Sequence, residues 1–336
     1  MLIGIHYMRG IAALMVVIFH AISFMAIYKN YDSPIPHHVL ATGVDIFFVI
    51  SGYLMVKTTQ KFKDSRLEWK LFLYKRLTRI APMYWLITIA ISIAILYKPS
   101  LSEKQVDIEL IVKSLLFIPT HIPGSDVQST ILPVGWTLVY EMFFYIIFAA
   151  LTSINYRAGL VALISFFAFL SAFHGMTDNY YYSLYSNPII LEFIFGAIIA
   201  KLPTPPHRKG LAIAFVGFVA LFVGSYIDGP DLGMRVISAG LGAALIIYGA
   251  SGLTIGRPLK IPSALGDASY SIYLTHMYII KAGAKALPPS LFSCTVLSLL
   301  SVLIGYAIYR AVELPIQNLF TNQKKPIRNI VQNANS

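Results

Sequence analysis

The chain has 336 residues, of which 57% are hydrophobic and only 12% are charged. Soluble domains carry roughly 25% charged residues, so this composition, with a mean hydropathy of +0.69, excludes an ordinary soluble domain and indicates a multi-pass membrane protein. Most of the net charge of +11 comes from Lys and Arg in the loops predicted to face the cytoplasm, so it gives little support to nucleic-acid binding. A single cysteine, Cys294, excludes an internal disulfide and a cysteine-based metal site.

Apolar segments long enough to cross a hydrocarbon core of roughly 30 Å recur along the chain. They predict an all-α bundle of about ten transmembrane helices, near residues 9–28, 40–57, 80–97, 134–153, 159–175, 188–201, 211–227, 235–252, 268–287 and 291–312. Lys and Arg gather in alternate loops, which predicts that both termini face the cytoplasm. We expect residues 1–320 to form one integral membrane domain and residues 321–336 a short polar cytoplasmic tail.

The first predicted helix carries two ionisable residues, Arg9 and His20, within its apolar stretch. They are eleven residues apart and therefore lie on nearly the same helix face, roughly 16 Å apart along the axis. Ionisable side chains inside a bilayer are costly and indicate a functional site. The alternative is that Arg9 snorkels to the headgroups and that His20 is a hydrogen-bonded packing residue.

Acidic residues occur in two later predicted helices. Asp45, in the stretch GVDIFFVISGYLM, lies near the outer end of the second helix, and a tightly packed helix with one interfacial acid is an equally good interpretation. Glu141, in WTLVYEMFFY of the fourth helix, has Tyr145 one turn further on the same face. Intramembrane acids are rare without a task, so we favour a functional role for Glu141, and Glu192 in the sixth helix is a weaker candidate of the same type.

Aromatic and basic residues supply further candidates. Trp136 and Tyr140 of the fourth helix could stack on a sugar ring or belong to the aromatic belt of the membrane interface. The basic loop from Lys57 to Arg79 contains aromatic residues between its charges, the pattern of an amphipathic helix lying on the membrane surface.

The ninth and tenth helices carry the remaining candidates. Tyr273 and His276 of the ninth helix share a face with Ser269. No HxxxH or HxxE pattern occurs in any span, so we predict no metal site. Near the inner end of the tenth helix, Arg310 and Glu313 are spaced to pair with each other, which favours a structural role.

Six stretches, taken in order, resemble the acyltransferase-3 family of bacterial membrane proteins: Arg9 with His20, GVDIFFVISGYLM, KRLTRIAPMYW, WTLVYEMFFY, LGDASYSIYLTH and ELP. The resemblance covers essentially the whole chain. It implies a ten-helix enzyme that takes an acyl group, usually acetyl from cytoplasmic acetyl-CoA, and places it on a carbohydrate hydroxyl. The chain also looks like the stand-alone acetyltransferases of exopolysaccharide assembly, which act in the bacterial inner membrane on lipid-linked repeat units.

The residues fit this chemistry, because attack of a sugar hydroxyl on a thioester requires a positioned base. We expect His20 to be that base and Arg9 to stabilise the thioester oxyanion or a CoA phosphate. Glu141 or Asp45 would then set the histidine tautomer or hold the acceptor. The candidates for binding CoA phosphates are Lys75, Arg76 and Arg79, and those for binding the acceptor are Trp136, Tyr140, Tyr145, Tyr273 and His276.

Two other functions stay open at this point. A transporter or flippase of lipid-linked sugar would also line its path with ionisable residues, although the sequence contains no convincing inverted repeat. A structural subunit of a polysaccharide assembly machinery would leave Arg9 and His20 without a task. The expected partners are a polysaccharide or lipid-linked oligosaccharide and membrane lipid. The sequence does not decide which acyl group is transferred. It also does not decide between direct transfer and a transient acyl-histidine.

Overall fold

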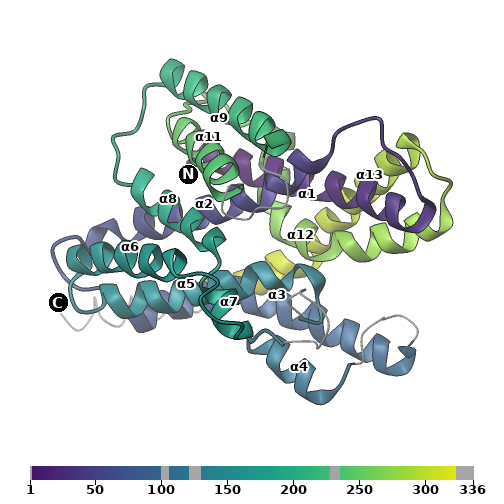
Figure 1. The fold of residues 1–336 in the computed structure, drawn as a ribbon, viewed down its shortest axis with the longest axis horizontal. Coiled ribbons are helices and arrows are strands. Elements are labelled where there is room, and N and C mark those ends of the chain that lie inside the picture. Colours follow the sequence, from purple (N-terminus) through teal and green to yellow (C-terminus); the bar gives the residue numbers. More distant parts are fainter. Residues whose placement is uncertain (1, 100–105, 121–129, 228–234, 323–336) are drawn as a thin grey trace.

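The computed structural model describes residues 2–99, 106–120, 130–227 and 235–322, which form helices and no β-sheet (Figure 1). In chain order these are α1 (Ile3–Lys29), η1 (His38–Thr42), α2 (Gly43–Thr59), η2 (Gln60–Phe62), α3 (Trp69–Tyr97), α4 (Ile108–Leu115), η4 (Pro133–Gly135), α5 (Trp136–Thr152), α6 (Tyr156–Ala172), α7 (Tyr180–Tyr185), η5 (Pro188–Ile190), α8 (Leu191–Ile199), α9 (His207–Ile227), η6 (Val236–Gly240), α11 (Leu241–Ser251), α12 (Lys260–Ala286), α13 (Leu291–Ile308), η7 (Tyr309–Glu313) and α14 (Leu314–Asn322).

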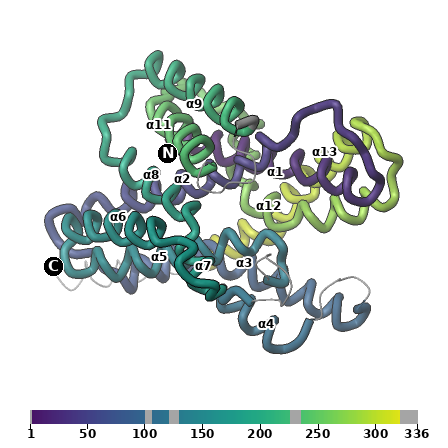
Figure 2. The backbone as a smooth tube through the Cα atoms, viewed as in Figure 1, coloured from purple at the N-terminus to yellow at the C-terminus, as the bar shows by residue number. Residues whose placement is uncertain are grey.

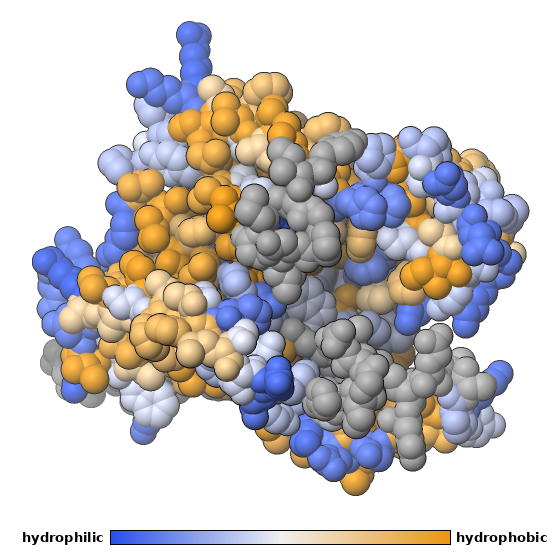
Figure 3. Space-filling model, in the orientation of Figure 1, coloured by the Kyte–Doolittle hydropathy of each residue, from blue (hydrophilic) through white to orange (hydrophobic). Residues whose placement is uncertain are grey.

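Seven helical stretches in the described part of the chain are long and apolar enough to cross a membrane. They are α1, η1 to η2 with α2 between them, α3, η4 with α5, α7 to α8, α9 as far as Ser225, and α13 continued to Phe320. In Figure 3, apolar side chains spread over the region of α6, α8 and α9, as expected for a surface that faces lipid. The fold is therefore an all-α, multi-pass membrane bundle.

Three of the ten predicted spans are not among these seven. The helices Tyr156–Ala172 and Val236–Ser251 are apolar but shorter, and α12 is long enough but more polar, with Asp267, Lys281 and Lys285 in its sequence. The count of ten spans and the orientation of the termini therefore stay predictions. Residues 323–336 of the predicted tail lie outside the described residues, as do 100–105 and 121–129 of the predicted loop from 98 to 133.

Glycines allow α2 to pack directly on its neighbours. A Cβ added to Gly52 would lie 1.9 Å from the Phe193 carbonyl oxygen, and one on Gly196 would lie 2.1 Å from the Val49 oxygen. The backbones of α2 and α8 thus touch, as small residues permit in membrane helices. Gly43 allows a similar approach to α1, because a Cβ there would lie 2.5 Å from the Ala12 oxygen.

The first helix lies at the centre of this arrangement. It contacts α2, α11, α12 and α13, and its beginning lies beside the end of α11 (Figure 2). Together α1, α12 and α13 extend to one side of the molecule, whereas α5 and α6 lie on the other (Figure 1). The face of α1 that carries Arg9 therefore meets helices from both halves of the chain.

The basic segment before residue 80 does not form a separate helix on the membrane surface. Instead α3 runs unbroken from Trp69 to Tyr97, with Pro82 inside it. The aromatic residue Phe72 stacks on Phe148 of α5 with ring centroids 5.2 Å apart, so the apolar side of these first turns packs on protein. The correction has a functional consequence, because it carries the basic residues of α3 into the bundle.

Candidate active site

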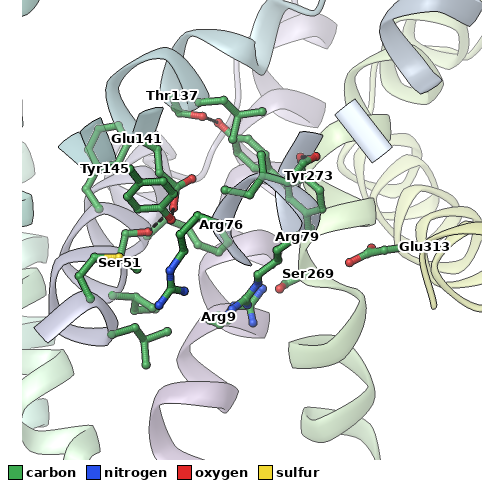
Figure 4. Close-up of a pocket in the computed structure, with 18 of the residues that line it drawn as sticks. Arg9, Ser51, Arg76, Arg79, Thr137, Glu141, Tyr145, Ser269, Tyr273 and Glu313 are labelled. Carbon is green, nitrogen blue, oxygen red and sulfur yellow. Dashed lines mark hydrogen bonds between the residues drawn. The ribbon is translucent and has the colours of Figure 1, made fainter. Parts of the chain in front are cut away.

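A cavity of about 440 Å³ opens among α1, α2, α3, α5, α12 and the end of the tenth predicted span (Figure 4). Its polar lining comes from segments far apart in the sequence: Arg9, Ser51, Lys75, Arg76, Thr78, Arg79, Thr137, Glu141, Tyr145, Asp267, Ser269, Tyr270, Tyr273, Tyr309, Glu313 and Gln317. The cavity therefore brings together seven of the site residues predicted from the sequence, namely Arg9, Lys75, Arg76, Arg79, Glu141, Tyr145 and Tyr273.

Three guanidinium groups converge in this cavity, those of Arg9, Arg76 and Arg79 (Figure 4). Arg76 donates from Nη2 to the Thr58 hydroxyl at 2.7 Å. Within the described residues, no carboxylate oxygen lies within 4.0 Å of any of the three groups. Because arginine presents several fixed donors and a permanent charge, such a cluster suits a multiply charged anion such as a phosphate ester.

Glu141 is held at one wall of the cavity by two hydroxyl groups. The Ser51 hydroxyl donates to Glu141 Oε1 at 2.6 Å, and the Tyr145 hydroxyl donates to the same oxygen (Figure 4). Ser51 was not among the predicted site residues, and its only sequence signal is its place beside Gly52 in the second helix. These bonds fix Glu141 within the cavity and leave it no hydrogen bond to His20.

His20 instead pairs with the second intramembrane histidine, His276. His20 Nδ1 lies 3.0 Å from the Val16 carbonyl oxygen and 3.1 Å from His276 Nε2. His276 Nδ1 lies 2.7 Å from the Tyr273 carbonyl oxygen. A carbonyl only accepts hydrogen bonds, so in the neutral pair both Nδ1 atoms carry the proton and His276 Nε2 accepts. His20 Nε2 then keeps its lone pair, and His276 has the tautomer-setting position that was predicted for Glu141 or Asp45.

Tyr273 separates the histidines from the cavity. Its side chain lines the cavity, and its ring centroid lies 5.8 Å from that of His276 and 5.6 Å from that of Phe47. Its hydroxyl is 3.1 Å from the Thr137 hydroxyl. The histidine pair thus lies directly behind one wall of the cationic cavity, although neither His20 nor His276 lines it.

Comparisons with known proteins identify the family of this chain. The family model of an acyltransferase domain matches residues 2–310. This chain belongs to the acyltransferase-3 family. It is similar to the exopolysaccharide production protein ExoZ of Rhizobium meliloti, at 33% identity over 298 residues, which are 83% of this chain and 91% of the relative.

Two longer relatives also match most of this acyltransferase. The peptidoglycan O-acetyltransferase OatA of Listeria monocytogenes is 25% identical over 328 residues, 84% of this chain and 52% of the relative. The O-acetyltransferase OatA of Staphylococcus aureus is 25% identical over 319 residues, 82% of this chain and 52% of the relative. No solved structure matches the acyltransferase.

Asp45 of the acyltransferase is an ion-pair residue within the bundle and does not line the cavity. It is fully buried, and Arg235 donates to both of its oxygens, from Nη2 at 2.9 Å and from Nε at 3.3 Å. Glu192 is also fully buried and interacts with Asp45. In the described part of the chain, neither Glu192 oxygen has a hydrogen-bond partner within 3.5 Å. Arg235 was not among the site residues predicted from the sequence, because an arginine beside a polar loop is typically found at the membrane surface.

Trp136 and Tyr140 pack in the aromatic core and do not form a platform for a sugar. Tyr140 is 1% exposed, and its hydroxyl donates to the Leu184 carbonyl oxygen at 2.9 Å. The Trp136 ring meets Tyr140 and Phe48 edge-on, with centroids 5.9 and 6.0 Å apart. Both rings are engaged in aromatic contacts within the protein, and Tyr140 is closed to solvent, which corrects the expected stacking surface.

Glu313 lines the cavity and does not pair with Arg310. Its Oε2 accepts from the Ser271 hydroxyl at 2.5 Å, and its Oε1 accepts from Gln317 Nε2 at 2.8 Å. Residues Tyr309–Glu313 form a π-helix, which shifts the helical register by one residue and breaks the expected i, i+3 pairing. The same turn places Glu313 among the cavity residues.

Proposed function

We propose that this membrane acyltransferase transfers an acetyl group from acetyl-CoA to a hydroxyl of an exopolysaccharide or other cell-envelope sugar. The proposal rests mainly on α1, which presents Arg9 to a cavity lined by two further guanidinium groups and presents His20 to His276 beyond it. Among the described residues, none of the three guanidinium groups pairs with a carboxylate. The first site suits an anionic donor, and the second suits a base.

The donor would enter the cavity with its phosphates toward Arg9, Arg76 and Arg79. Two of these arginines, with Lys75, come from the basic first half of α3, and we place this side of the molecule in the cytoplasm, where CoA is found. In CoA a long pantetheine arm separates the phosphates from the thioester. Since Arg9 and His20 are roughly 16 Å apart along α1, phosphate binding at Arg9 directs the acyl carbon past Tyr273 toward the histidines.

His20 would act as the general base. As the acceptor oxygen attacks the thioester carbonyl, His20 Nε2 takes the hydroxyl proton, the new carbon–oxygen bond forms and the carbon–sulfur bond breaks. The proton then passes to the leaving thiolate, which restores neutral His20 and releases CoA thiol. The hydrogen bond from His20 Nδ1 to His276 becomes charge-assisted while His20 holds the extra proton, which stabilises the imidazolium.

The proposed reaction is tested with the purified protein in phosphatidylcholine nanodiscs, radiolabelled acetyl-CoA and oligosaccharides prepared from exopolysaccharide. We expect an alkali-labile label on the sugar that depends on the protein. Movement of lipid-linked sugar across a liposome membrane, without any label transfer, would instead support the transporter interpretation and contradict the proposal.

Replacing Arg76 and Arg79 together by alanine should weaken acetyl-CoA binding. A hydrogen bond to a charged group contributes about 1.5–3 kcal/mol, so we expect an affinity about ten- to a hundredfold lower for each arginine that contacts a phosphate. Isothermal titration of the nanodisc protein measures this. The control is Arg157→Ala, which removes an exposed arginine that pairs with Asp64 outside the cavity; an equal loss in control and double variant, or no loss in either, would place the donor elsewhere.

A further inference from the structure

The contact between His20 and His276 is the first of three side-chain pairs that line up between α1 and α12. We call each pair a rung and the three together the row. Beyond the histidine pair, Lys281 Nζ lies 5.1 Å from the ring centroid of Phe24, and Lys285 Nζ lies 5.0 Å from the ring centroid of Tyr28. Each α1 ring is therefore matched by a basic side chain of α12. The rungs are spaced by about one helical turn, because residues four apart in a helix share a face.

The rings of α1 also stack on one another along this row. The His20 and Phe24 centroids are 6.1 Å apart with planes inclined by 23°, and those of Phe24 and Tyr28 are 5.7 Å apart at the same inclination. The row thus forms a continuous aromatic strip with cations along one side. It runs away from Arg9, toward the ends of α1 and α12.

Exposure increases along the row from the histidines outward. His276 is fully buried, Phe24 and Lys281 are half-buried, and Lys285 is exposed. On the face shown in Figure 3, hydrophilic side chains gather at this end of the α1, α12 and α13 group. The strip therefore connects the aqueous surface with the base proposed for the reaction, from the side opposite to the cationic cavity.

We propose that Phe24, Tyr28, Lys281 and Lys285 form the acceptor subsite and that it takes a sugar chain bearing carboxylate groups. The inference rests on the proposed function, since it assigns the acceptor to the end of the site that the donor does not use. Because stacking and the two ammonium groups already use faces of Phe24 and Tyr28, the sugar chain would meet the edges of these rings. Ammonium groups form charge-assisted hydrogen bonds with carboxylates. Each rung advances about 6 Å along the helix axis, a distance of the same order as one sugar unit.

The charge of the row favours an acidic chain over a neutral one. Lys285 has no carboxylate within 4.0 Å among the described residues. Lys281 lies one rung from His20 and is half-buried. Its ammonium is held over the Phe24 ring by a cation–π contact, which keeps a positive charge close to the position of the reacting hydroxyl.

The experiment compares two acceptors that differ only in charge. An oligosaccharide containing glucuronic acid is used alongside its carboxyl-reduced form, in which each glucuronic acid has become glucose. With labelled acetyl-CoA and wild-type protein in phosphatidylcholine nanodiscs, we expect kcat/KM for the acidic acceptor to be about tenfold higher or more, as two charged contacts allow. The double variant Lys281→Met with Lys285→Met keeps the apolar stems and should use both acceptors within about twofold of each other.

Two controls separate this inference from a general defect. The double variant should keep the wild-type affinity for acetyl-CoA, and Lys98→Met, just after the end of α3, should keep the acidic preference. A wild-type protein that uses both acceptors equally, or a double variant that keeps the preference, would overturn the acceptor subsite and leave the proposed function standing. A wild-type protein that acetylates neither acceptor would overturn both.

Discussion

Replacing His20 by alanine should lower the rate of acetyl transfer about a hundred- to ten-thousandfold, the contribution of a well-placed general base. The reason lies in the hydrogen bonds of the neutral histidine pair. Both Nδ1 atoms donate, toward Val16 and His276 in one case and toward Tyr273 in the other, so His20 Nε2 is the nitrogen left to accept a proton. A single-turnover assay with labelled acetyl-CoA and an excess of acceptor measures the chemical step directly.

The matched controls for this variant concern binding and tautomer. His20 does not line the cationic cavity, so His20→Ala should bind acetyl-CoA like the wild type. His276→Gln keeps an acceptor oxygen beside His20 Nδ1 and should lose less activity than His276→Ala, which leaves that proton with Val16 alone. Full transfer by His20→Ala would remove His20 from the reaction, and equal activity of the two His276 variants would remove its positioning role.

Replacing Arg235 by methionine should cost about 3 kcal/mol of stability. This is the lower end of the penalty for removing one partner of a buried ion pair, because the Arg235 side chain is 32% exposed. The variant leaves the fully buried Asp45 carboxylate without the two hydrogen bonds that Arg235 donates. The equally buried Glu192 interacts with Asp45 and adds repulsion when both carboxyl groups are ionised. Unfolding in detergent micelles, followed by circular dichroism against added denaturing detergent, gives the free energy.

A second substitution tests the cause of this loss. Adding Asp45→Asn to Arg235→Met removes the orphaned charge and should recover part of the stability, because the two positions are directly coupled. Arg157→Met breaks a pair whose side chains are both more than 60% exposed and should cost at most about 1 kcal/mol. If Arg235→Met unfolds at the same detergent concentration as the wild type, Asp45 does not depend on this ion pair.

The local features of the chain were predictable from the sequence. The apolar stretches identified a multi-pass helical protein because crossing a bilayer requires a minimum length of apolar helix, which each segment carries by itself. Arg9, His20 and Glu141 stood out because ionisable groups are costly in that setting. The face shared by Arg9 and His20 follows from helical geometry alone. In the structure α1 is continuous through both residues, with Arg9 lining the cavity and His20 further along the helix, beyond the cavity.

The pairings between helices were decided only by the tertiary structure. Asp45 pairs with Arg235 and His20 with His276, and each of these partners is about 190 residues or more away in the chain. Side-chain pairing at such separations depends on which helices are neighbours and how far each is rotated, and close glycine contacts such as Gly52 against Phe193 set that arrangement.

Glu313 shows the same limit within a single helix. Its spacing from Arg310 predicted an ion pair, but the π-helix at Tyr309–Glu313 turns it into the cavity. Such a shift arises when packing against neighbouring helices outweighs the regular backbone hydrogen bonds. The sequence by itself therefore determined which residues were costly to bury in this acyltransferase, because burial cost belongs to each side chain. The tertiary structure decided which partner offsets the burial cost of each residue, because that depends on which two side chains meet.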